Sequence, residues 1–419
     1  MTKVPNKAAV VPMTSRERTA SLSLASIFAL RMLGLFLILP VFAVWAQTLP
    51  DGGDPFLAGL ALGIYGLTQG VLQIPFGAAS DRFGRKPVIA IGLVIFVAGS
   101  VLAALSTSIE MVIAGRALQG AGAVSAAVTA MISDSVRDAV LTRAMALVGA
   151  SIGLTFAASL VFSPILAGSI GVPGLFWLTA VLAILAVGVI LFIVPDAEKA
   201  PVEPGALSEA EAKEKVSFGK VLLDPQLLRL NFGIFVLHMA QMTLFVVIPV
   251  KLAAQAFPMA HHWVVYLPAV LIAFAGLMPA IRFAERRGAL KRLFISAITL
   301  LLAVFAAFSL LDESILGIAF LLLVFFFGFN ILEASLPSLI SKSAPASARG
   351  LALGVYNTTQ SIGLFVGGAA GGWLAGRWGS GAAYAFCAVL MLAWLFIARG
   401  MRTNRTHEPG SEIEMNKKA

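Results

Sequence analysis

Residues 56–105 read FLAGLALGIYGLTQGVLQIPFGAASDRFGRKPVIAIGLVIFVAGSVLAAL, in which two long apolar runs flank a short basic loop. A helix needs about 20 apolar residues to cross a bilayer, whereas a transmembrane barrel strand shows a shorter, alternating pattern. The stretch therefore predicts two membrane-spanning helices. The whole chain agrees, because 59% of its 419 residues are apolar and 12% are charged. A soluble protein of this length could not bury so much apolar surface.

Twelve apolar runs predict an all-α membrane protein with two six-helix bundles. The expected helices are 21–46, 56–77, 88–105, 110–132, 142–167 and 175–194 in the first bundle, and 227–251, 262–283, 293–311, 315–340, 350–375 and 381–399 in the second. The expected organisation is a cytoplasmic tail at 1–20, bundles at 21–195 and 227–399, a cytoplasmic linker at 196–226 and a cytoplasmic tail at 400–419. Within the linker, residues 207–223 have the pattern of an amphipathic helix.

Basic residues predict the orientation of the chain. With both termini in the cytoplasm, 26 of the 30 Lys and Arg residues fall on the cytoplasmic side, and Lys251 and Arg377 fall outside. This bias follows the positive-inside rule. The net charge of +9 is therefore interpreted as a property of cytoplasmic loops, and no nucleic-acid partner is expected. The expected location is a bacterial inner membrane.

The two halves of the sequence resemble each other at a nearly constant offset. Residues 35–41 match residues 244–250, and residues 81–84 match residues 285–288. The counterparts of the first loop in the second half are Glu285, Arg286 and Gly288. Parallel six-helix halves predict a pseudo-two-fold axis along the membrane normal, with a substrate site near the midplane between the halves.

The loop between the second and third helices carries glycines and charges that suggest a conformational switch. These residues are Gly77, Asp81, Arg82, Gly84, Arg85 and Lys86. Gly84 permits a tight turn, and Asp81 can pair with Arg85 or face the positive end of a neighbouring helix. Asp134, at the end of the fourth helix, is a second expected partner of Arg85. The alternative interpretation is that these charges only set the topology.

Further motifs lie inside the first, fourth and fifth helices. They are Gly34 and Pro40 in the first, Arg116 within RALQGAG in the fourth, and Gly149, Gly153 and Pro164 in the fifth. Together with the 77–87 loop, they resemble the motifs of the major facilitator superfamily and of its drug/proton antiport branch. One departure is Ser163, which stands where that branch has a glycine before the proline.

The resemblance extends to about residue 400 and implies the fold of that superfamily, a role in proton coupling for Arg116, and a central cavity lined by the first, fourth, seventh and tenth helices. The chain especially resembles YajR-type transporters, but their soluble C-terminal domain is not expected here, because only about twenty polar residues follow Arg399.

Each expected cavity helix contains one ionisable residue well inside the membrane. These residues are Arg31, Arg116, His238 and Glu333, and the amides Gln241 and Asn330 share faces with the last two. Glu333 is the candidate for proton coupling or for binding a cationic substrate. The alternative is a fixed ion pair with Arg31 or Arg116. His238 is a second candidate proton carrier or a packing residue, and Arg31 is also a candidate counter-ion for an anionic substrate.

Small residues and prolines predict close helix packing and kinks. Gly363, Gly367 and Gly371 follow the spacing of a small-residue face, and in the superfamily such a face on the eleventh helix can slide against the second. Static packing is the alternative. Kinks are expected at Pro40, Pro164 and Pro249.

The predicted function is secondary active transport, by proton-coupled antiport that exports small organic compounds. The expected partners are the substrate, protons and lipid, with a monomeric chain. No metal and no cofactor is expected, because the proton gradient supplies the energy. The alternatives are a proton symporter or facilitator, and a membrane sensor of the same fold. An enzyme is disfavoured, because the sequence has no P-loop and no HExxH motif.

Overall fold

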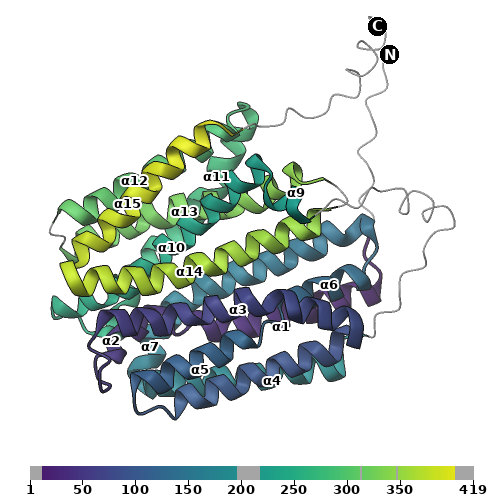
Figure 1. Cartoon of the computed structure of the whole chain (residues 1–419), viewed down its shortest axis with the longest axis horizontal. Coiled ribbons are helices and arrows are strands. Elements are labelled where there is room, and N and C mark those ends of the chain that lie inside the picture. Colours follow the sequence, from purple (N-terminus) through teal and green to yellow (C-terminus); the bar gives the residue numbers. More distant parts are fainter. Residues whose placement is uncertain (1–11, 196–217, 312–313, 346–347, 402–419) are drawn as a thin grey trace, which may run out of the picture.

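The computed structural model describes residues 12–195, 218–311, 314–345 and 348–401 (Figure 1). The regular structure of these residues is entirely helical. The first half contains α1 (Ser15–Phe36), α2 (Leu39–Ala46), α3 (Pro55–Phe83), α4 (Arg85–Ala104), α5 (Ile109–Ala121), α6 (Ser125–Ser135), α7 (Asp138–Gly188) and η1 (Val189–Ile193). The second half contains α9 (Phe218–Leu222), α10 (Pro225–Ala254), η2 (Met259–His261), α11 (Trp263–Arg286), α12 (Leu290–Leu310), α13 (Ile315–Ser343), α14 (Arg349–Trp378) and α15 (Ser380–Arg399).

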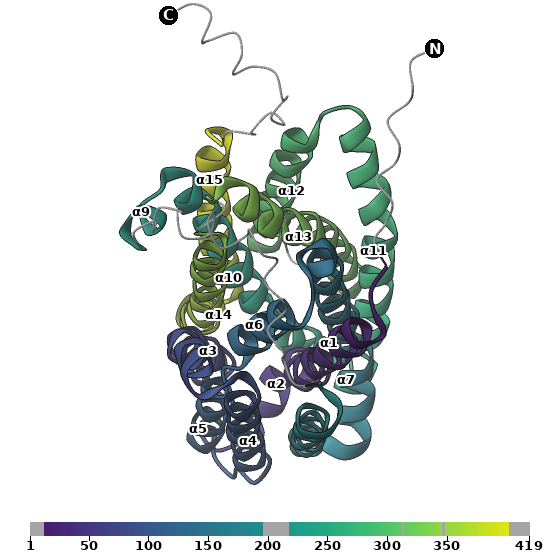
Figure 2. The ribbon, with the colours of Figure 1, turned by 90° about the vertical axis from the view of Figure 1, so that its right-hand side faces the viewer.

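Ten helical stretches within the described residues are long and apolar enough to cross a membrane. One of them, Ala139–Ile193, has 55 residues and contains two spans, because Gly171 (φ 71°) interrupts the helical backbone. The less apolar α14 packs against both α3 and α10 and forms the remaining span. These spans confirm the predicted all-α fold of twelve transmembrane helices in two bundles. Figure 2 shows the bundles end-on, with α1–α7 on one side and α10–α15 on the other.

The two ends of the helices are named the α2 end and the α9 end, after a helix that lies at each. The α2 end contains α2, η2 and the loop 47–54, and lies at the left of Figure 1. The α9 end contains α9 and the turn between α3 and α4, and lies at the right.

The first helix begins at Ser15, ahead of the predicted boundary at residue 21. The reason is a capping box: the Thr14 side chain accepts the backbone N–H of Glu17, and the Glu17 carboxylate accepts that of Thr14. The residues after Asp224 also form helix slightly earlier than predicted, because Asp224 caps α10 and Pro225 follows it. The linker residues 196–217 and the tail residues 402–419 lie outside the described residues.

The first span is broken into α1 and α2 just before Pro40, where a kink is predicted. Because Pro40 has no N–H and the chain bends, the amides of Val41 and Phe42 both bond to the carbonyl of Ile38. The carbonyl of Leu37 instead accepts a hydrogen bond of 2.5 Å from the Ser163 hydroxyl on α7. Ser163 thus satisfies a backbone group that the break releases within the membrane. Pro164 and Pro249, by contrast, lie inside α7 and α10, and the break in α7 falls at Gly171 instead.

The glycines of α14 form two faces. A Cβ atom at Gly363, Gly367 or Gly371 would lie 2.1–2.7 Å from atoms of α10, so the predicted small-residue face packs on α10 and not on α3. The contact with α3 is made by a neighbouring face, where a Cβ at Gly368 would lie 2.3 Å from the carbonyl oxygen of Gly59. Close backbone approach therefore holds α14 between the two bundles.

The two bundles are packed together at the α2 end and near the middle of the molecule. At the α2 end, a Cβ at Gly168 of α7 would meet Ala260 of η2 at 2.8 Å. Near the middle, the Phe156 ring packs against Phe245 and Phe326 at 6.3 and 6.1 Å. Toward the α9 end, the predicted motif residues Gly149 and Gly153 have no atom within 4 Å of an added Cβ.

We expect Gly368→Ala to destabilise the protein by about 1–3 kcal/mol, because the added methyl group clashes with backbone. Gly354→Ala is the matched control on the same helix, since a Cβ there meets no atom within 4 Å. Thermal unfolding in detergent should show a lower Tm for the first variant and an unchanged or higher Tm for the second. Equal Tm values would contradict the assigned packing.

We expect Ser163→Ala to lower the free energy of unfolding by about 1–3 kcal/mol, because it leaves the buried Leu37 carbonyl without a donor. Ser169→Ala serves as control, because the Ser169 hydroxyl is exposed and bonds within its own helix. Unfolding by SDS in mixed micelles measures both. A loss in the Ser169 variant as large as in the Ser163 variant would contradict this assignment.

Candidate functional site

Arg31 lies on α1 and its side chain is 1% exposed. Its guanidinium donates hydrogen bonds to Tyr65 Oη at 2.6 Å and Gln69 Oε1 at 2.9 Å, both on α3, and to Ser125 Oγ at 2.9 Å on α6. The Nε atom is buried without a hydrogen-bond partner. Arg31 therefore ties three helices of the first bundle together through neutral acceptors.

Arg116 on α5 is completely buried. It donates to Gln119 Oε1 at 2.9 Å and to the Ala61 carbonyl at 3.4 Å, while one terminal nitrogen has no partner. The guanidinium lies 5.0 Å from the Tyr65 ring centroid, and that of Arg31 lies 5.9 Å from the same centroid. The structure therefore brings both predicted arginines to one tyrosine, where cation–π attraction stabilises them.

His238 on α10 and Glu333 on α13 form the polar centre of the second bundle. His238 Nε2 lies 3.7 Å from Glu333 Oε2 and 2.6 Å from Nε2 of Gln360 on α14. His238 Nδ1 lies 3.3 Å from the Ile234 carbonyl. Because a carbonyl only accepts, Nδ1 carries the proton, and Nε2 accepts the Gln360 amide. The imidazole is therefore neutral in this arrangement, and its Nε2 atom lies beside the carboxyl group while accepting the Gln360 amide.

The side chain of Glu333 is partly exposed, but one of its carboxyl oxygens is buried. Its side chain is 37% exposed, whereas its Oε2 atom is buried and has no hydrogen-bond partner. Its ion-pair contact among the described residues is with His238. The alternative of an ion pair with Arg31 or Arg116 is not what this arrangement shows, since both arginines bond to uncharged groups.

Polar groups around this pair were only partly predicted. Gln241 and Asn330 are both 7% exposed, and Asn330 Nδ2 has no hydrogen-bond partner. Tyr356 on α14 is 3% exposed, with an unpartnered hydroxyl. Sequence reasoning missed Tyr356 and Gln360, because α14 was considered only for its glycines. Polar residues within a predicted membrane span were the available signal.

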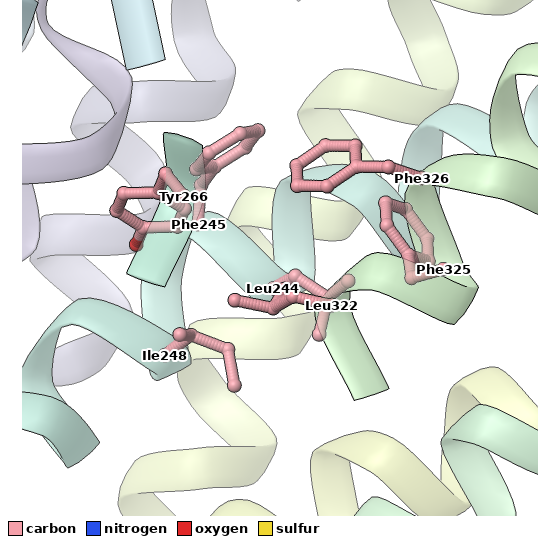
Figure 3. Close-up of a pocket in the computed structure, with 7 residues that line it drawn as sticks. All are labelled: Leu244, Phe245, Ile248, Tyr266, Leu322, Phe325 and Phe326. Atoms are coloured by element: carbon pink, nitrogen blue, oxygen red, sulfur yellow. The ribbon is translucent and has the colours of Figure 1, made fainter. Parts of the chain in front are cut away.

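An apolar pocket lies on the α2 side of this centre. It is lined by Leu244, Phe245, Ile248, Tyr266, Leu322, Phe325 and Phe326 of α10, α11 and α13 (Figure 3). Its cavity volume of ≈ 10 Å³ is far below the roughly 300–1,000 Å³ of ligand pockets. The aromatic side chains thus close the bundle next to the His238–Glu333 pair.

The predicted switch loop is organised around Arg85 at the α9 end. Arg85 forms ion pairs with Asp81 and, at 2.9 Å, with Asp134 on α6, and it donates to Ser80 Oγ at 2.7 Å. Gly84 between α3 and α4 has φ 95°, a value that disfavours other residues. Gly77 lies close to α6, with Ala126 3.7 Å from an added Cβ, and Arg82 lies over the ring of Phe83.

The counterpart loop of the second half makes the same turn with fewer polar contacts. Gly288 has φ 60° and donates its N–H to the carbonyl of Glu285, which closes the turn between α11 and α12. Glu285 and Arg286 are exposed. The repeat therefore preserves the glycine turn, while the charge network around Arg85 belongs to the first half.

A second ion pair at the α9 end was not predicted. The Glu17 side chain is 7% exposed, and its carboxylate accepts Nε, Nη2 and the backbone N–H of Arg137 at 2.8–3.0 Å. This carboxylate raises the pKa of Arg137. Arg137 follows Asp134 by only three residues. Because Glu17 pairs with Arg137 and Asp134 pairs with Arg85, this short segment connects the start of α1 to the turn between α3 and α4. The signal that could have found it is the T-x-x-E capping box at residue 14.

Comparisons with known proteins agree with this geometry. The family profile described as Major Facilitator Superfamily matches residues 24–368 and 263–418. The chain is 44% identical to the inner membrane transport protein YajR of Escherichia coli, over 93% of this chain and 85% of that one. It is 27% identical to the multidrug resistance protein MdtH of Yersinia enterocolitica, over 82% and 83% of the two chains.

The fold is also similar to solved structures. A bacterial homologue of the human lysosomal transporter Spinster, solved in an inward-facing and occupied conformation, superposes with a TM-score of 0.74. The sequence identity is 14%, and the superposition covers 93% of this chain and 98% of that one. At this identity the likeness concerns the fold alone.

We expect Glu17 and Arg137 to stabilise the α9 end jointly, because the Glu17 carboxylate accepts hydrogen bonds from both the side chain and the backbone of Arg137. A double-mutant cycle with Glu17→Gln and Arg137→Gln, followed by SDS unfolding, should give a favourable coupling free energy. Arg18→Gln, an exposed neighbour on α1, should not couple to Glu17→Gln. Additive losses for Glu17 and Arg137 would contradict the pairing.

Proposed function

The chain belongs to the major facilitator superfamily, and on this premise we propose that it is a proton-coupled antiporter that exports small organic compounds by alternating access. Transport as such follows from the family match and the 44% identity to YajR. The export mode is supported by the similarity to the multidrug resistance protein MdtH and by Gly34 and Pro40 at the α1–α2 break. The inner membrane is the proposed location, with both termini in the cytoplasm and the monomer as working unit.

The contact between His238 and Glu333 is the observation that supports the proposal of proton coupling. Glu333 Oε2 lies 3.7 Å from His238 Nε2, so a proton taken up by either group makes this contact attractive. Protonated His238 forms an ion pair with the ionised Glu333, and the Gln360 amide then turns its oxygen toward Nε2. The carboxyl group can therefore load a proton without moving its helix.

The exposed part of Glu333 provides the route by which this proton is exchanged. With the proposed topology the α9 end faces the cytoplasm, and the packed α2 end faces outward. In this state the pair can release its proton to the cytoplasm, while the seam at Phe156 and Gly168 excludes the outside. Reversal of the packing would then expose the same carboxyl group to the outside, where it takes up the next proton.

A second candidate function is symport or facilitated diffusion. Ser163 favours it, because this residue departs from the antiporter motif before Pro164. The direction of flux under an imposed pH gradient separates the two: an antiporter accumulates substrate on the acidic side, and a symporter accumulates it on the alkaline side. A facilitator shows no accumulation.

We expect Glu333→Gln to abolish substrate-driven proton flux in proteoliposomes, because the amide cannot bind and release a proton. His238→Gln should slow the flux by about tenfold or more, as removal of a proton-transfer partner commonly does. Fluorescence of a pH-sensitive dye inside the vesicles measures both.

Glu110→Gln is the matched control, since Glu110 is an exposed acid at the start of α5. It should retain normal flux, and all three variants should keep the wild-type Tm within a few degrees. Unchanged proton coupling in Glu333→Gln would exclude this carboxyl group as the coupling site.

A further inference from the structure

A groove lies between the two bundles at the α2 end. Its walls are α2 and the start of α3 on one side and α10 on the other, with the ends of α14 and α15 at the rim. Its cavity volume of ≈ 230 Å³ lies just below the roughly 300–1,000 Å³ of ligand pockets. The groove thus has room for part of a small organic molecule directly outside the packed seam.

The lining of the groove is apolar with one cation. Ten of the thirteen lining residues are Gly, Ala, Val or Pro, and the other three are Gln47, Lys251 and Ser380. Lys251 is half-buried, and its Nζ lies 5.9 Å from the Tyr384 ring centroid. The combination suits a ligand with an apolar body and a negative charge.

The charges inside the first bundle favour the same ligand. Among the described residues, Arg31 and Arg116 bond only to uncharged acceptors, and each keeps one buried nitrogen without a partner. A buried cation without an anion is costly in a membrane. Glu333, the acid placed opposite them, is engaged with His238 in the other bundle.

We propose that the transported substrate is an amphipathic organic anion, and that the groove at Lys251 is the site where its anionic group is held on the outer side. This inference rests on the proposed function and names its substrate class. The buried arginines attract the anion into the path between the bundles, and Lys251 attracts it at the outer end. The apolar walls of the groove hold its hydrocarbon part.

The charge of the substrate determines which gradients drive its export. An anion that leaves while a proton enters moves two positive charges inward per cycle, if one proton is exchanged. The membrane potential, negative inside, therefore drives export together with the pH gradient. Export of a monovalent cation by the same exchange would be electroneutral.

The test uses three compounds with one ring system: naphthaleneacetate as the anion, naphthylmethylammonium as the cation and naphthalenemethanol as the neutral form. Transport is measured in proteoliposomes with an imposed pH gradient, with and without a potassium diffusion potential. We expect proton-coupled movement of the anion, accelerated by the potential. Lys251→Gln should raise the KM for the anion about tenfold, since a hydrogen bond to a charged group contributes at least that factor.

Arg377→Gln is the matched control, because Arg377 is the other basic residue expected outside and does not line the groove. It should leave KM unchanged, as should Lys251→Arg, which keeps the charge. Proton-coupled movement of the cation or the neutral compound without the anion would overturn the inference and leave the proposed function intact. An unchanged KM in Lys251→Gln would overturn the role of the groove. If none of the three compounds showed proton-coupled movement, the result would contradict both the inferred substrate class and the proposed function.

Discussion

A charged side chain inside the hydrocarbon core is stabilised only by the polar groups that the protein itself brings to it. Several polar contacts between helices among the described residues meet that requirement. Arg31 gathers acceptors from α3 and α6, and Arg116 gathers them from α3 and α5. Tyr65 serves both arginines. The positions of α1, α3, α5 and α6 in the first bundle therefore depend on where two guanidinium groups can be solvated.

Backbone polar groups inside the membrane also need partners from the protein. The helical hydrogen-bond pattern is broken, or a side chain is missing, at positions where two helices meet. The break before Pro40 releases the Leu37 carbonyl, and Ser163 of α7 supplies the missing donor. The serine that departs from the antiporter motif is therefore explained by a hydrogen bond to the first span. In α14, glycines allow backbone-to-backbone contact with α3 and α10, so that one helix of modest hydropathy is covered by protein on two faces.

Most of the fold could be predicted from the sequence, because the length and hydropathy of a span follow directly from the thickness of the bilayer. The helix boundaries could not be predicted as well, since local chemistry sets them: the Thr14–Glu17 capping box extends α1, and Gly171 interrupts α7 without ending its hydropathy. The helix that packs on the glycine face of α14 could not be predicted either. The spacing of the glycines defines the face, but it does not say which neighbouring helix covers it. For the site, span centres predicted Arg31, Arg116, His238 and Glu333. Their contacts depended on Tyr65 and Gln360, whose importance arises only from tertiary packing.

The distribution of charge between the bundles links this static arrangement to a transport cycle. The positive groups lie in the first bundle with neutral partners, and the titratable pair lies in the second. Neither centre is neutralised by the other in this state, so each can respond to a species that enters between them. A proton changes the charge of the second centre alone, and it thereby changes the attraction between the bundles without any change in the first. Because the bundles are packed at Gly168 and around Phe156, a change in that attraction acts on a molecule whose seam is closed at the α2 end. Proton and substrate can then be coupled through electrostatic attraction between the two centres. No direct contact between them is required.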